Sequence, residues 1–237
     1  RYYKMAADKG HIDAMYRYGF MLSKGEGVSI NKEESCRYYK MAADKGSKKA
    51  MNNYGFMLEN GEGVSMNIEE ACRYYKMAAD KGSKRAMNTY ANMLKKGEGV
   101  SMNKKDACRY YKMAAEKGHI YAMNNYAVML ENGEGVRINK EEACRYYKMA
   151  ADKGNKNAMN RYGLMLSKGE GVSLNKEEAC RYIKMAADKG NIKAMNNYGS
   201  MLKKGEGVSM NKEEACRYFK MAADKGNIKA MYKYGLM

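Results

Sequence analysis

The sequence predicts an all-α fold in which two-helix units are stacked into a solenoid. A motif of 36 residues is repeated through the whole chain. Its copies start at Arg1, Arg37, Arg73, Arg109, Arg145, Arg181 and Arg217. A fixed period of this length indicates stacked supersecondary units, each too small to bury its own apolar face. Each copy holds two stretches with helical apolar spacing, and the chain has no proline to interrupt them.

The first helix of each unit, helix A, is predicted at 47–59 in the copy that spans 47–82. Its apolar residues Ala50, Tyr54, Met57 and Leu58 follow the spacing i, i+4, i+7 and i+8 of one helical face. The segment Gly-Glu-Gly that follows at 61–63 ends the helix, as glycine does just beyond a helix end.

The second helix, helix B, is predicted at 68–81. Asn67 and Glu70 form the pattern of an N-cap with a capping box. Lys81 is expected in the last turn, where a cation suits the helix dipole, and Gly82 ends the helix. The apolar face consists of Ala71, Tyr74, Tyr75, Ala78 and Ala79. The equivalent caps are Asn31, Asn67, Asn103, Asn139, Asn175 and Asn211.

These signals predict a single repeat array over residues 1–237. Its terminal segments, 1–10 and 227–237, are half-repeats that each contain one helix. The complete units are predicted at 11–46, 47–82, 83–118, 119–154, 155–190 and 191–226.

The charge and the cysteine content of the sequence limit the class of partner and the cellular compartment that we expect. The net charge is +17, and the copy at 73–108 is the most basic, which favours acidic partners there. No apolar run has the length of a membrane span. One cysteine recurs in each of the six complete copies, too far from its equivalents for a disulfide. This predicts reduced thiols in an intracellular, cytoplasmic protein. With only two histidines and no zinc spacing, no metal or cofactor site is expected.

Three recurring features resemble catalytic or binding motifs, and each has a structural interpretation. Gly-Glu-Gly-Val lacks the preceding strand and third glycine of a dinucleotide site, so a structural turn is expected. Glu69 and Glu70 lie in the first turn of helix B, where carboxylates favour the dipole, and no repeated histidine or serine accompanies them. The tyrosine pairs, such as Tyr74 and Tyr75, lie on the apolar face. The chain is therefore not expected to be an enzyme.

The residues that vary between copies lie on one side of helix A. With Ala50 as the core direction, a step of about 100° per residue places positions 49, 52, 56 and 59 opposite the core. An asparagine recurs there, and a row of amides predicts a site for the backbone of an extended peptide. The alternative is that asparagine is a soluble filler, against which its helix propensity counts.

We call this surface the helix-A stripe and predict that it binds the partner. Its predicted partner-binding residues are Lys49, Asn52, Phe56, Arg85, Asn88, Asn92, Tyr121, Asn124, Val128, Asn160, Leu164, Lys193 and Asn196.

The repeat resembles the Sel-1-like repeat (SLR) family, a relative of the tetratricopeptide arrays. The residues that carry the resemblance are Ala50, Tyr54-Gly55, Leu58, Gly61-Glu62-Gly63-Val64, Asn67, Ala71, Tyr74-Tyr75, Ala78-Ala79 and Gly82. The sequence departs from the family pattern in two ways. The large apolar residues of helix A are exchanged in size order, as Tyr54 and Leu58, and Asn67 replaces an aspartate. The resemblance implies a right-handed superhelix of antiparallel helix pairs, with helix A on the concave surface, and a non-enzymatic adaptor role.

Three functions follow from these patterns. The first is a scaffold that binds a protein or peptide segment, acidic near the most basic copy, on the concave helix-A surface. The second is a structural element that stacks end to end through its open half-repeats, since a heterologous interface that does not close makes fibres. The third, nucleic-acid binding, rests on charge alone and is not favoured, because no recognition motif accompanies it.

Overall fold

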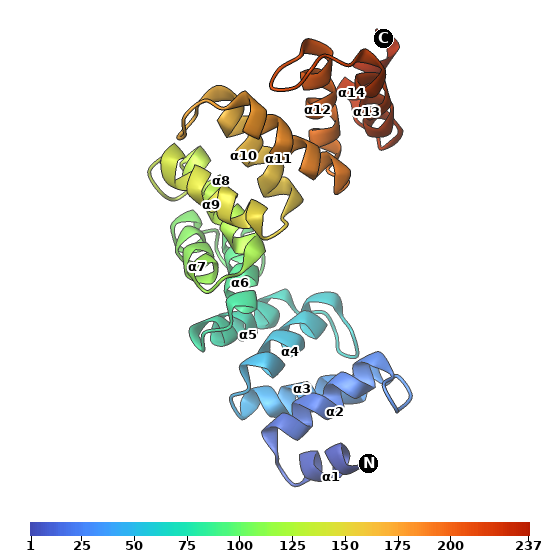
Figure 1. The fold of residues 1–237 in the computed structure, drawn as a ribbon. Coiled ribbons are helices and arrows are strands. Elements are labelled where there is room, and N and C mark those ends of the chain that lie inside the picture. Colours follow the sequence, from blue (N-terminus) through green and yellow to red (C-terminus); the bar gives the residue numbers. More distant parts are fainter. The chain divides into compact units, whose positions relative to one another are not determined.

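The computed structural model describes residues 1–237 and contains fourteen α-helices and no strand (Figure 1). The helices are α1 Tyr2–Asp8, α2 Ile12–Lys24, α3 Lys32–Asp44, α4 Lys48–Asn60, α5 Ile68–Asp80, α6 Lys84–Lys96, α7 Lys104–Glu116, α8 Ile120–Asn132, α9 Lys140–Asp152, α10 Lys156–Lys168, α11 Lys176–Asp188, α12 Ile192–Lys204, α13 Lys212–Asp224 and α14 Ile228–Gly235. Even-numbered helices are helix A and odd-numbered helices are helix B, which confirms the predicted all-α solenoid of helix pairs.

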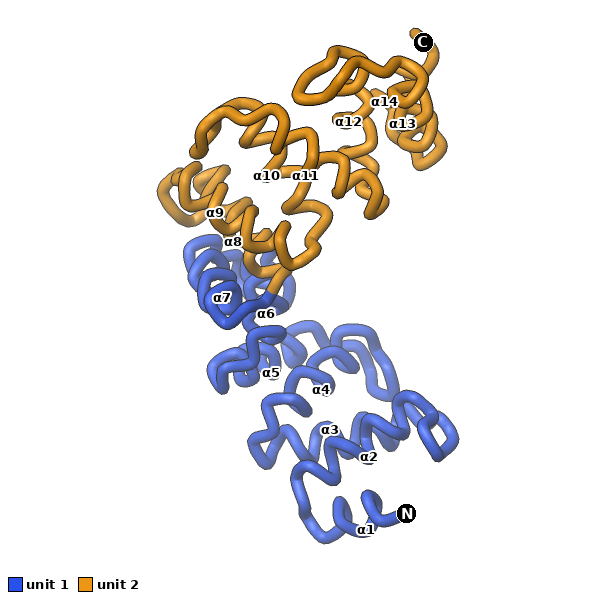
Figure 2. Tube along the Cα trace, in the orientation of Figure 1, with its two compact units in different colours: residues 1–119 blue, residues 120–237 orange.

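The chain divides into two compact units, Arg1–His119 and Ile120–Met237 (Figure 2). Unit 1 contains α1 to α7, and unit 2 contains α8 to α14. Within each unit, every helix packs against the helices that precede and follow it in the sequence. The prediction of one array through the whole chain stays a prediction.

Helix A is bounded by a side-chain cap and a left-handed glycine. In α4 the Ser47 hydroxyl accepts a hydrogen bond from the Ala50 N–H. Gly61 adopts φ +66°, and its N–H donates to the Met57 carbonyl oxygen, so it satisfies a carbonyl that the helix end leaves free. The helix covers Lys48–Asn60, one residue later than predicted at each end.

Helix B begins at its predicted asparagine caps. In α5 the Asn67 side chain accepts from the Glu70 N–H at 2.9 Å, and all six predicted asparagines cap their helices in this way. The predicted end at Lys81 was wrong by one residue. Gly82 adopts φ +82° and its N–H bonds to the Ala79 carbonyl at 2.8 Å, which ends α5 at Asp80 and leaves Lys81 outside the last turn.

The Gly-Glu-Gly-Val segment is a structural turn, as predicted. Its first glycine caps helix A, as Gly61 does for α4. Its second glycine, Gly63, has φ +69°, and a Cβ there would run into the backbone of Lys32 at the start of α3. Only glycine meets both requirements, because L side chains rarely adopt this φ and the neighbouring backbone leaves no room.

The tyrosine pairs of the complete repeats pack on the apolar face of helix B, as predicted, with Tyr75 buried and Tyr74 half-buried. The rings of Tyr54 and Tyr74 meet edge to face at 4.7 Å, and the other complete repeats hold equivalent pairs. The Tyr74 hydroxyl donates to Asp44 at 3.1 Å, at the end of the preceding helix B. Burial raises the pKa of Tyr54 to about 12, with a further contribution from the negative charge of Glu70.

The six cysteines are free thiols, five buried and Cys216 half-buried. Burial, and then the charge of Glu70, raises the pKa of the Cys36 thiol to about 11. None of the helices combines the length and the apolar character that crossing a membrane requires.

Candidate functional site

The helix-A stripe is only partly a surface. The exposed members are Lys49, Phe56, Arg85, Tyr121 and Lys193. The half-buried members are Asn88, Asn92, Asn124, Val128 and Leu164. The buried members are Asn52, Asn160 and Asn196, whose exposed fractions are 6%, 5% and 8%. The stripe thus has exposed charged and aromatic residues beside a recessed row of amides.

The burial of the asparagine row corrects the helical-wheel prediction. That prediction assumed one core direction, set by Ala50, and placed Asn52 directly away from it. Helix A instead packs on two sides, against helix B and against helix A of the next repeat. The second contact is visible in unit 2, where the Asn197 amide on α12 donates to Asn160 Oδ1 on α10 at 2.9 Å.

A second pair of amides links α10 and α12 one turn nearer their N-termini. Asn191, the N-cap of α12, accepts from the Ala194 N–H at 2.9 Å. Its amide nitrogen donates to Asn157 Oδ1 at 2.8 Å and to the Lys156 carbonyl at 3.3 Å. Sequence reasoning missed these links; the recurrence of asparagine 34 and 37 residues apart was the available signal.

Three oxygens in the row have no internal partner. The side-chain Oδ1 atoms of Asn52, Asn124 and Asn196 are buried and accept no hydrogen bond. The Asn124 amide nitrogen donates to Asn125 Oδ1 at 3.4 Å, so only its oxygen is unused. An unpaired buried acceptor costs about 1–3 kcal/mol, which makes each oxygen a favourable place for an incoming N–H.

Tyrosines of helix B reach the same side of helix A. Tyr75 donates to Glu59 at 2.7 Å, and Tyr147 donates to Glu131 at 2.6 Å. Burial, followed by the bonded carboxylate, raises the pKa of both tyrosines far above the usual value. Glu131 also pairs with Arg161 at 3.6 Å, so its charge is neutralised locally. Sequence reasoning missed these pairs.

Unit 2 has a groove of about 420 Å³ along the stripe. It is lined by Asn124, Val128, Lys156, Asn157, Asn160, Arg161, Gly190, Asn191, Ile192 and Lys193. Four of the predicted partner-binding residues, from α8, α10 and α12, are therefore brought together. The lining includes three cations and no carboxylate, so the groove favours an anionic occupant.

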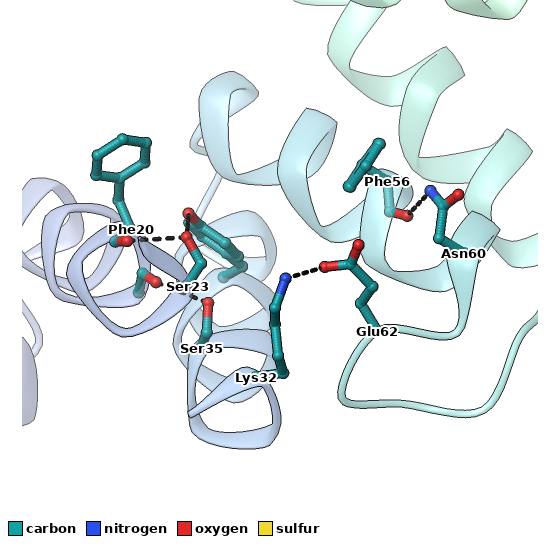
Figure 3. A network of polar contacts seen from close by, with 9 residues as sticks. Phe20, Ser23, Lys32, Ser35, Phe56, Asn60 and Glu62 are labelled. Carbon is teal, nitrogen blue, oxygen red and sulfur yellow. Dashed lines mark hydrogen bonds and ion pairs between the residues drawn. The ribbon is translucent and has the colours of Figure 1, made fainter. Parts of the chain in front are cut away.

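Unit 1 has a smaller groove of about 200 Å³ with a different chemistry. It is lined by Phe20, Ser23, Lys24, Lys32, Tyr39, Asn53, Phe56, Met57, Glu62 and Arg85. Figure 3 shows part of this region, where Lys32 forms an ion pair with Glu62 and the Phe56 carbonyl accepts from Asn60. Two predicted stripe residues, Phe56 and Arg85, meet here.

A third hollow, of about 470 Å³, lies outside the stripe in unit 2. Cys144 and Glu142 are among its lining residues. Burial, and then the charge of Glu178, raises the pKa of the Cys144 thiol to about 11, so little thiolate forms near neutral pH. No group of three or more His, Cys, Asp or Glu side chains is arranged to hold a metal ion.

Comparisons with known proteins give the family and the fold. The family model of the Sel1 repeat matches residues 1–11, 12–47, 48–83, 84–119, 120–155, 156–191 and 192–227. No curated protein sequence matches the chain.

Solved structures share the architecture. A Sel1 repeat protein from Oxalobacter formigenes is 30% identical with a TM-score of 0.80, over 90% of this chain and 85% of that chain. A protective antigen of uropathogenic Escherichia coli strains, which displays an SLR fold, is 26% identical with a TM-score of 0.92 over 98% of this chain. This chain spans 50% of the length of that antigen. Pseudomonas aeruginosa PilF, at 15% identity and a TM-score of 0.67, shares the fold alone.

The seven family matches, the Gly-Glu-Gly-Val turn and the tyrosine-packed helix pairs agree with one another. The chain belongs to the Sel1 repeat family.

Proposed function

We propose that the chain is a non-enzymatic scaffold that binds a segment of a partner protein along the helix-A stripe. Sel1 repeat proteins are in general protein-interaction scaffolds. The observation that carries the proposal is the meeting of stripe residues from successive helices in grooves. Asn124, Val128, Asn160 and Lys193 line the groove of unit 2.

The difference between the two grooves supports a protein partner over a small repeated ligand. The groove of unit 1 has aromatic rings, Phe20 and Phe56, whereas that of unit 2 is lined by amides and cations, with no carboxylate in its lining. The groove of unit 1 fits an apolar segment of a protein, and the groove of unit 2 fits an acidic one. A buried free thiol in most repeats supports a reducing compartment, such as the cytoplasm, for this role.

A capture experiment tests the proposal. The stripe variant carries alanine at Lys49, Phe56, Arg85, Tyr121 and Lys193, which are all exposed, so folding is expected to be retained. Capture of partners from the source cell's extract should be lost, as judged by mass spectrometry. A companion variant tests the amides of the asparagine row, with alanine at Asn52, Asn88, Asn124, Asn160 and Asn196.

The matched control removes three cations and two exposed apolar side chains outside the stripe. It carries alanine at Lys112, Lys176, Lys220, Met66 and Met102. Retained capture by this control and loss in the stripe variant support the proposal. Equal capture by all variants with native circular dichroism would refute it.

End-to-end association is a second candidate function, because a solenoid grows by stacking equivalent repeats on one another. Sedimentation velocity over a wide concentration range tests this idea: concentration-dependent growth supports it, and one monomeric species at every concentration contradicts it.

A further inference from the structure

The unpaired oxygens of the asparagine row follow a rule that the repeat itself reveals. In unit 2, Asn160 Oδ1 accepts from Asn197, the residue 37 positions later on the next helix A. The residue 37 positions after Asn124 is Arg161, and Arg161 points to Glu131 instead. Asn124 Oδ1 is consequently left without a donor.

The other two unpaired oxygens fit the same rule. The residue 37 positions after Asn52 is Thr89, whose hydroxyl donates to the Arg85 carbonyl at 3.2 Å. The residue 37 positions after Asn196 is Lys233, which donates to the Ser200 hydroxyl at 2.6 Å. The acceptors of Asn52 and Asn196, both more than nine-tenths buried, are unused where the next helix lacks the second asparagine.

One of these acceptors lies in the cationic groove of unit 2. Asn124 lines that groove together with Lys156 and Lys193, which form no ion pair. Its amide can turn the oxygen into the groove by rotation about its last side-chain bond, a torsion with a broad energy profile. The groove then offers one hydrogen-bond acceptor beside cations. A peptide that has backbone N–H groups and side-chain carboxylates fits this combination.

We propose that the unit 2 groove binds an extended acidic peptide segment, whose backbone N–H donates to Asn124 Oδ1 and whose carboxylates pair with Lys156 and Lys193. This inference rests on the proposed scaffold function and names the chemistry of its partner. Successive A helices are about 10 Å apart at ordinary packing distances, so about three extended residues pass each repeat. About six residues therefore reach from Asn124 to the second unpaired oxygen in unit 2, that of Asn196.

Arg161 allows the acceptor to be tested apart from the charge. In Arg161→Asn, an asparagine stands 37 residues after Asn124, as Asn197 stands 37 residues after Asn160. Its amide N–H is expected to donate to Asn124 Oδ1, so this oxygen gains an internal donor. Arg161→Ala removes the same cation but leaves the oxygen unpaired. The difference in affinity between these two variants measures the contribution of the unpaired Asn124 oxygen. Both variants keep the hydrogen bond that Tyr147 donates to Glu131.

The probe is a fluorescein-labelled octapeptide of alternating Glu and Ala, titrated with the full chain by fluorescence polarisation. We expect Arg161→Asn to bind it about five- to tenfold more weakly than Arg161→Ala, the range for loss of one hydrogen bond. A peptide with N-methyl groups on alternate backbone nitrogens should bind the wild-type chain more weakly by a similar factor. Lys193→Ala should also weaken binding.

Several results would overturn the inference. These are equal affinity of Arg161→Asn and Arg161→Ala, insensitivity to N-methylation, or equal binding of a Lys-Ala octapeptide. Equally tight binding of single-stranded oligothymidine would show attraction by charge alone. If the octapeptide fails while the stripe variant still loses its captured partner, the scaffold function stands and the acidic-peptide inference is refuted.

Discussion

A glycine in the middle of helix A sets how closely helix B approaches it. A Cβ added at Gly55 would lie 3.2 Å from the Tyr75 ring and 3.3 Å from a backbone oxygen of α5. At Gly163 the same atom would lie 2.6 Å from Cγ1 of Ile183 and 2.9 Å from a backbone oxygen. Two other repeats have a buried alanine at this position, Ala91 and Ala127. Whether a methyl group is tolerated at this position therefore depends on the helix-B side chain that lies opposite it.

We expect Gly163→Ala to lower the free energy of unfolding by about 1–2 kcal/mol. Alanine gains about 1 kcal/mol in helix propensity, but overpacking against the β-branched Ile183 costs about 1–3 kcal/mol and the backbone adds to it. Gly55→Ala is the matched control, because the tyrosine ring opposite needs to shift by only a few tenths of an ångström. Urea midpoints give the comparison; a higher midpoint for Gly163→Ala than for wild type would contradict it.

The buried thiols make a second prediction for single residues. Burial raises the pKa of Cys36, Cys72 and Cys144 to about 11, so the thiolate that attacks alkylating agents is scarce at pH 8. Iodoacetamide should label these cysteines slowly in the native chain and quickly in guanidinium, and half-buried Cys216 should react first. Peptide mass spectrometry after timed labelling measures this order; uniform fast labelling of the native chain would exclude it.

At the scale of the helix, the first tyrosine of helix B joins two neighbouring repeats. Its ring packs against the helix A that directly precedes it in the sequence, and its hydroxyl bonds to the aspartate that ends the preceding helix B. In α11, Tyr182 meets Tyr162 edge to face at 4.8 Å and donates to Asp152 at 2.8 Å. The hydrogen bond requires a protonated hydroxyl, and the edge-to-face contact requires a closely packed ring. Ionisation of the tyrosine therefore weakens the stacking of the helices.

We therefore expect the stability to fall in alkali. Burial, followed by the aspartate hydrogen bond, raises the pKa of these tyrosines from 10.0 to about 12; they are Tyr38, Tyr74, Tyr110, Tyr182 and Tyr218. The folded state holds protons that the unfolded state loses, so this stabilisation is complete below about pH 10 and disappears as the pH rises towards about 12. Urea midpoints across this range should decrease, and less steeply in Tyr182→Phe. A constant midpoint would refute the coupling.

The helices were predictable because their signals are local. Asn67 as a cap and Gly61 as a stop depend on a few neighbouring residues, and both appear as expected. Lys81 was misplaced by one residue because the positive φ of Gly82 fixes the end of the helix, and periodicity does not report backbone dihedrals.

The candidate site was less predictable because it depends on contacts between repeats. A helical wheel for Asn160 contains no information on the next helix A, so it did not foresee the hydrogen bond from Asn197. The tyrosine–glutamate pairs, such as Tyr147 with Glu131, also join two helices and were missed. Comparison of positions one period plus one residue apart would have indicated the amide pair.

At the scale of the whole molecule, charge is the main imbalance. The net charge is +17, and the copy at 73–108 contributes most to it. In unit 1 the first turn of α7 contains only one acidic residue, Asp106, while α3 and α5 each have two glutamates there. Lys105, which is exposed, occupies the place of the missing glutamate. Replacing Lys105 with a carboxylate therefore improves the interaction with the helix dipole and reduces the excess of positive charge.

We expect Lys105→Glu to raise the melting temperature by about 1–4 °C at low salt. A carboxylate in the first turn gains about 0.3–1 kcal/mol from the dipole, and self-repulsion among the cations decreases as well. Lys105→Gln removes the cation without adding the carboxylate, so it should give a smaller increase. Because the screening length falls from about 30 Å at 0.01 M salt to about 3 Å at 1 M, the increase should shrink in high salt. An increase that is independent of salt would assign the effect to helix propensity, and a decrease would show that Lys105 has a favourable partner in this copy.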